Sequence, residues 1–255
     1  MYDNLLKQMF CLIMVIATTI MIVPAVSNAQ TIPDIPKEVE NYECSMKEIQ
    51  KSAKPIDLEN IFKEGLLAAK VLTAHEKSFN WTSKLVRFDL ATFEKTKHMM
   101  IGFWVNREEV IIVKPDPFFF VKLAEEKGTE VDRIFFSILQ KTYPGWFPVY
   151  MRQQSDFGGC IIFDGTTLLE TYGIWVGFQK NYPESYQEKV QEELKKIEDY
   201  ILAACICDGE DNYWQELQNF VKIYPDLPIT KSVSSRLEMT DKSELNLRFH
   251  CIVAH

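Results

Sequence analysis

The sequence lacks the motifs by which the common enzyme classes are recognised. It contains no G-x-S-x-G, no H-E-x-x-H, no P-loop and no G-x-G-x-x-G pattern. Only four histidines occur in 255 residues, so a histidine-centred catalytic triad has few possible members. No C-x-x-C or histidine-rich spacing that would hold zinc is present. We therefore expect no cofactor and no metal, and a protein that acts by binding rather than by catalysis.

Basic residues are also scarce relative to acidic ones. The chain has 28 Lys and Arg residues against 36 Asp and Glu residues, which gives a formal net charge of −8. Contact with a phosphate backbone requires a surplus of basic side chains, so we expect no nucleic-acid partner. Hydrophobic residues make up 47% of the chain, which is enough for the core of an ordinary globular protein. The expected partner is another protein or a small apolar ligand.

Long apolar runs are confined to the start of the chain. Residues 9–26 carry no charge, and the small residues Ser27 and Ala29 stand at the −3 and −1 positions of a signal peptidase site before Gln30. The sequence therefore predicts a signal peptide over residues 1–29 and a periplasmic or extracellular location. The alternative is an uncleaved membrane anchor formed by residues 9–26, because an apolar run of this length can also span a bilayer.

Apolar spacing divides the rest of the chain into helices and strands. A period of three to four residues predicts helices after Pro36, after Asp57, after the Thr129/Asp132 capping box, at about 183–207 and around 214–221. Alternating or continuous apolar runs predict strands at 86–90, 99–105, 110–113, 118–121, 147–151, 160–163, 172–178 and 245–253. Strict β-α-β alternation is lacking. The prediction is an α+β fold with a mainly antiparallel sheet flanked by helices, in a single domain over residues 30–255.

Five cysteines remain after removal of the export segment, which is an odd number for an oxidising compartment. Cys205 and Cys207 stand two residues apart on a predicted helix, so their side chains diverge and a bond between them is disfavoured. Cys44 and Cys207 both lie away from the apolar faces of their predicted helices, which makes them the candidates for a disulfide. Cys160, Cys205 and Cys251 are expected to be buried as small hydrophobic residues.

One stretch offers an alternative to a binding function. The residues 160–170, C-I-I-F-D-G-T-T-L-L-E, are similar to the first motif of haloacid-dehalogenase-type phosphatases. The resemblance implies that Asp164 is the nucleophile, but Thr166 stands where that family has its second Asp. An Asp-Gly pair between two apolar runs is also a hairpin signal, and we favour the turn. The alternative function is a hydrolase that uses the scattered carboxylates Asp156, Asp164 and Glu170.

Aromatic residues offer two interpretations. Residues 118–120 are three consecutive phenylalanines, which either line a lipid pocket or pack in the core. Four tryptophans lie on different predicted elements and either converge on a ligand or pack in the core, namely Trp104, Trp146, Trp175 and Trp214. The sequence alone does not decide between these alternatives.

Cleavage after Ala29 predicts that the exported protein begins at Gln30. Intact mass measurement or N-terminal sequencing of the exported protein checks this expectation. A product that keeps residues 9–26 and stays with the membrane fraction would contradict it.

Overall fold

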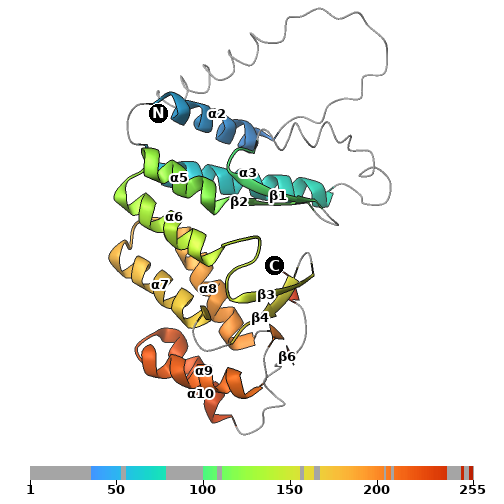
Figure 1. Cartoon of the computed structure of the whole chain (residues 1–255), viewed down its shortest axis with the longest axis vertical. Helices are drawn as coiled ribbons and strands as arrows, with labels where there is room; N and C mark the ends of the chain where they lie inside the picture. The colour runs from blue at the N-terminus through green and yellow to red at the C-terminus, as the bar shows by residue number, and fades with distance from the viewer. Residues whose placement is uncertain are drawn as a thin grey trace, which may run out of the picture.

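The computed structural model describes residues 36–52, 56–78, 100–107, 111–155, 158–163, 167–203, 205–207, 210–239, 248–249 and 253–254. The predicted export segment and the predicted strand at 86–90 lie outside these residues. The described elements are stacked along the long axis of the molecule (Figure 1). None of the helices among them is long and apolar enough to cross a membrane.

The first two described helices form where apolar spacing predicts them. Helix α2 (Lys37–Lys51) packs on helix α3 (Leu58–Ser78) at one end of the molecule (Figure 1). The carboxylate of Asp57 accepts a hydrogen bond from the backbone N–H of Asn60 at 3.2 Å, which caps the start of α3. The predicted apolar face of α2 is confirmed, because its four members are buried: Val39, Tyr42, Met46 and Ile49.

A β-hairpin follows α3. Strand β1 (Phe103–Arg107) pairs with strand β2 (Ile111–Pro115) in antiparallel register, with Trp104 opposite Lys114. The predicted pair of strands is therefore confirmed, but the paired segments lie further along the chain than expected. Asn106 was expected in the turn because it is polar, but it pairs with Ile112 and belongs to β1.

The phenylalanine-rich segment after β2 forms a helix, so the predicted strand at 118–121 is wrong. Helix α5 (Pro117–Lys127) begins at a proline, whose fixed φ suits the first helical position. Asp116 caps it, because its carboxylate accepts from the backbone N–H of Phe118 at 3.0 Å. Phe120 is fully buried, whereas Phe118 is exposed.

Helix α6 (Glu130–Thr142) confirms the predicted capping box. The hydroxyl of Thr129 accepts from the backbone N–H of Asp132 at 3.3 Å, and the Asp132 carboxylate accepts from the backbone N–H of Thr129 at 2.7 Å. The other oxygen of this carboxylate accepts from the Tyr186 hydroxyl at 2.6 Å. The start of α6 is thereby tied to the segment that leads into α8.

The second half of the chain contains more helix than apolar runs predicted. Helix α7 (Thr167–Asn181) occupies the predicted strand at 172–178, and its buried residues repeat at helical spacing: Leu168, Tyr172, Trp175 and Phe178. Helix α8 (Gln187–Ala203) ends before Cys205 rather than at 207. Helix α9 (Glu210–Ile223) was expected, whereas helix α10 (Pro228–Glu238) was not.

A second sheet lies beside the helices and contains parallel as well as antiparallel pairs. Strand β3 (Met151–Ser155) pairs antiparallel with β4 (Gly158–Ile161), which pairs parallel with β5 (Cys205–Ile206). Strand β5 pairs parallel with β6 (Arg248–Phe249), and β7 (Val253–Ala254) pairs antiparallel with β4. Small sheets and many helices in this order confirm the α+β class.

Aromatic rings hold the helices together. The rings of Phe135 and Tyr186 are stacked with their centroids 3.6 Å apart, and Phe120 stacks on Phe136 at 5.1 Å. Phe62 of α3 makes edge contacts with both pairs at 5.2 to 6.2 Å. Such contacts each add about 0.5 to 1.5 kcal/mol beyond the burial of their area. They join α3, α5 and α6 to the segment that enters α8.

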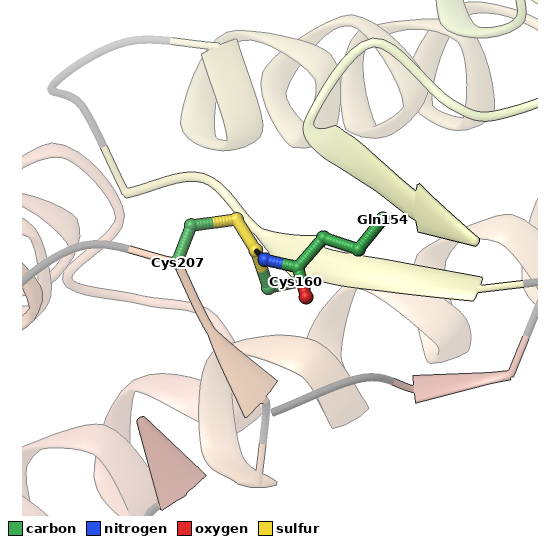
Figure 2. Close-up of a disulfide and its surroundings, with 3 residues drawn as sticks. All are labelled: Gln154, Cys160 and Cys207. Atoms are coloured by element: carbon green, nitrogen blue, oxygen red, sulfur yellow. Dashed lines mark hydrogen bonds between the residues drawn. A yellow bond between two sulfur atoms is a disulfide. The ribbon is translucent and has the colours of Figure 1, made fainter. Parts of the chain in front are cut away.

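Cys207 is bonded to Cys160, so the expected pairing of Cys207 with Cys44 is wrong (Figure 2). The expectation assumed that the helix continues to residue 207, whereas the chain is extended there and pairs with β4. Ile161 is opposite Ile206 in the two strands. Cys160, which precedes Ile161, and Cys207, which follows Ile206, therefore lie together on the opposite face of the sheet, with their Cα atoms 4.9 Å apart. Residues 205 and 207 are not bonded to each other, as expected.

The other described cysteines are also oxidised. Cys44 and Cys205 are both disulfide-bonded. Cys160 and Cys205 are buried, as their interpretation as core residues requires, but neither is a free thiol. Cys160 also accepts a hydrogen bond through its sulfur from the side-chain amide of Gln154 at 3.0 Å (Figure 2). Cys251 lies outside the described residues.

Loss of the Cys160–Cys207 bond should destabilise the protein by about 2 to 4 kcal/mol, because the bond restricts a loop of 47 residues in the unfolded chain. Urea unfolding of the Cys160→Ala/Cys207→Ala double variant measures this loss. A peptide map of the unreduced wild type that places Cys207 with Cys44 would contradict the structure.

Candidate functional site

A cavity of about 470 Å³ lies where the β1–β2 hairpin and α3 meet α8. Helix α3 contributes Phe62 and Leu66, the hairpin contributes Trp104 and Lys114, and the segment after α6 contributes Trp146. Three charged residues of α8 complete the lining: Lys189, Glu192 and Lys196. Elements distant in sequence therefore build one site.

The cavity has aromatic walls. The rings of Trp104 and Trp146 lie 6.4 Å apart with their planes inclined at 38°. Phe118 lies 6.3 Å from Trp104 but is not part of the lining. Two of the four tryptophans considered in the sequence thus converge on a cavity. Trp175 instead lies in the core, where its ring N–H donates to the Thr142 hydroxyl at 3.1 Å.

Trp214 is separate from this group. Its ring packs against Tyr213 on α9, with the centroids 5.2 Å apart, and it does not line the cavity. The phenylalanine run is divided as well, because Phe118 is beside Trp104 while Phe120 belongs to the core.

Lys114 places an amine against the aromatic wall. Its Nζ lies 4.7 Å from the centroid of the Trp146 ring, in the geometry of a cation–π contact. Neither this Nζ nor the Nε1 of Trp146 has a hydrogen-bond acceptor among the described residues, although both atoms are buried. Burial, with Lys196 and Lys189 nearby, lowers the pKa of Lys114 to about 7.

A buried charge network lies beside this amine on α8. Glu193 is fully buried, and its Oε1 is 2.7 Å from the Nζ of Lys189. The hydroxyl of Tyr143 donates to the other carboxylate oxygen at 2.7 Å and accepts from Lys196 at 3.3 Å. Burial opposes ionisation of Glu193, but Lys189, Lys196 and Tyr143 outweigh it, so its pKa lies below its ordinary value.

Of the three carboxylates considered for a hydrolase, only Glu170 is among the described residues, and it does not line this cavity. Glu170 is exposed in the first turn of α7, a helix that does not contribute to the lining. Asp156 and Asp164 lie outside the described residues. The hairpin expected at the Asp-Gly pair is wrong, because β4 is followed by helix α7 rather than by a second strand.

Sequence reasoning missed the lysines of the site. The segment 189–196, K-V-Q-E-E-L-K-K, carried a signal, because Lys189, Glu193 and Lys196 recur at spacings of four and three and so share one helix face. Lys114 gave no comparable signal, since a single lysine that follows an apolar run is common at the end of a strand. Among the residues that the structure places, no group of His, Cys, Asp and Glu side chains is arranged to hold a metal ion.

Comparison with protein-family models, curated proteins and solved structures finds no match to this chain. The role of the cavity is therefore inferred from its own residues.

Replacing Lys114 by Met should raise stability at pH 6 to 7. The folded state holds this amine with a pKa of about 7 against an ordinary value of 10.5. Between these values the unfolded chain binds the extra proton, so wild-type stability rises with pH across this window. The gain in melting temperature of Lys114→Met over wild type should be largest below pH 7 and smaller at pH 9. In a protein of this size, each kcal/mol in the free energy of unfolding shifts the melting temperature by about 2 to 4 °C.

The exposed Lys195 on α8 provides the control for this comparison, because it forms an ion pair with Asp199 at the surface. Lys195→Met should show no such pH-dependent difference in melting temperature. A Lys114→Met variant whose difference from wild type is the same at pH 6 and pH 9 would contradict the lowered pKa.

Proposed function

We propose that the protein is an exported, non-catalytic binding protein that holds a small, planar ligand with large apolar faces in the cavity between the hairpin and α8. Its volume of about 470 Å³ is within the roughly 300 to 1,000 Å³ typical of small-molecule sites. Such sites combine apolar walls with a few convergent polar groups. The tryptophan pair and the lysines beside it have this character.

The convergence of Trp104 and Trp146 is the observation that carries the proposal. These residues come from β1 and from the segment after α6, yet their rings lie side by side at the cavity. Indole rings offer a large apolar area with little side-chain entropy to lose, which makes them effective contacts for flat ligands.

The state of Glu193 favours binding over acid–base chemistry. A general acid is most useful when its pKa is near the working pH. Glu193 is instead held ionised by Lys189 and by the Tyr143 hydroxyl, with a lowered pKa. The carboxylate therefore acts as a structural anchor for α8 in this proposal.

Export is part of the proposal and is supported by two features. The apolar residues 9–26 precede a small-residue cleavage pattern, and the chain contains a disulfide between Cys160 and Cys207. Structural disulfides persist mainly in oxidising compartments. A periplasmic or extracellular location agrees with both features, with an anchor through residues 9–26 as the alternative.

The binding proposal predicts that a neutral flat probe enters the cavity. Isothermal titration calorimetry with 2-naphthylmethanol should show binding by the oxidised protein. Trp104→Leu and Trp146→Leu should each weaken it about tenfold, because each removes a large apolar wall. Trp214→Leu is the matched control and should leave the affinity within about twofold. Binding that depends on Trp214 but not on the other two would place the ligand elsewhere and overturn the proposal.

A further inference from the structure

We infer that the ligand is an aromatic oxyanion such as an aryl carboxylate, whose anionic group accepts hydrogen bonds from Lys114 and Trp146. This inference rests on the binding function proposed above and names the class of ligand. It follows from the donors, the charges and the aromatic walls that meet at the cavity.

Two buried donors at the cavity have no acceptor. The Nζ of Lys114 and the Nε1 of Trp146 are both buried without a hydrogen-bond partner among the described residues, and the amine lies over the same indole ring. A buried donor without an acceptor loses its hydrogen bonds to water without replacement, so such groups are rare away from functional sites. A carboxylate has two oxygens and only accepts, so it can satisfy both of these donors.

The charge around the cavity favours an anion. The described lining contains four lysines, Lys70, Lys114, Lys189 and Lys196, and one carboxylate, Glu192. Glu193 lies behind the lining and forms an ion pair with Lys189. Cations therefore outnumber carboxylates here, although the chain as a whole has a net charge of −8. A local positive potential in an acidic protein selects anionic ligands and disfavours cationic ones.

Binding of an anion should be coupled to protonation of Lys114. The groups that face its amine are Lys189, Lys196 and Glu193 of α8. Burial, together with the two lysines, lowers its pKa to about 7. An adjacent anion favours the charged amine and raises this pKa. The bound complex therefore takes up a proton near and above pH 7, and affinity for the anion falls as the pH rises beyond 7.

The aromatic ring of the ligand and its anionic group have separate partners. In this inference, Trp104 and the apolar residues of α3 contact the aromatic ring of the ligand, whereas Lys114 and Trp146 donate hydrogen bonds to its anionic group. Probes that share one ring system and differ only in charge separate these two contributions.

The test compares 2-naphthoate, 2-naphthylmethanol and 2-naphthylmethylammonium by isothermal titration calorimetry on the oxidised protein at pH 7. We expect 2-naphthoate to bind about tenfold or more tightly than the alcohol, and the ammonium probe to bind weakest. Repeating the naphthoate titration in buffers of different ionisation enthalpy measures proton uptake. Uptake should be about half a proton per ligand at pH 7 and larger at pH 8.

Two variants assign the effect to the named donors. Lys114→Met should lower naphthoate affinity about tenfold and abolish the proton uptake, while affinity for the alcohol stays within about twofold. Trp146→Phe keeps an aromatic wall but removes the N–H, and should weaken naphthoate about threefold or more with little effect on the alcohol. The control Lys195→Met removes the same charge from the exposed side of α8 and should change neither.

The outcomes distinguish the two levels of the proposal. Equal affinities for the three probes, or proton uptake that survives in Lys114→Met, overturn the anion inference and leave the cavity as an apolar site. Failure of all three probes to bind overturns the proposed function together with this inference.

Discussion

The buried negative charge of Glu193 is the constraint on which the arrangement of the cavity depends. Removing a carboxylate from water costs several kcal/mol unless a partner compensates it. Lys189, one turn earlier on α8, and Tyr143, at the end of α6, supply that compensation at 2.7 Å each. Tyr143 in turn positions Lys196. The amines of Lys189 and Lys196 at the cavity are thereby positioned by the carboxylate of Glu193, which is not itself part of the lining.

A second polar contact also links α6 to the start of α8. The Tyr186 hydroxyl binds the Asp132 carboxylate at the start of α6, while Tyr143 binds Glu193 from the other end of that helix. Between these contacts the ring of Tyr186 stacks on Phe135. Helix α8 and the residue before it are therefore linked to α6 by two polar contacts and an aromatic stack.

The sequence predicted correctly those helices whose first residues were marked by a capping residue as well as by apolar periodicity. Caps at Asp57 and at Thr129/Asp132, together with apolar periodicity, located α3 and α6 correctly. Aromatic and β-branched runs at 118–121 and 172–178 indicated strands, but the first follows an Asp-Pro helix start and the second has a helical period through Trp175 and Phe178. In both segments the strand propensity of a few residues was outweighed by helix capping and tertiary packing.

The candidate site was less predictable than the fold. Sequence reasoning left open whether the tryptophans converge, and no local pattern shows that Trp104 and Trp146 do while Trp175 and Trp214 do not. The lysines come from α3, β2 and α8, so their proximity exists only after these elements pack. The disulfide shows the same limit, because its pairing follows from the register of β4 and β5 rather than from the helical positions assumed for Cys207.

The pairing of β4 with strands from later in the chain also determines when the second sheet can be completed during synthesis. Its neighbours β5 and β7 come from much later in the chain, and β7 pairs directly with Gly158 and Gly159. Until those residues have been synthesised, this side of β4 is an open edge that another chain can pair with. The sheet therefore cannot close during synthesis of its first strands, and this side of β4 is completed only when β5 and β7 have been added to the chain.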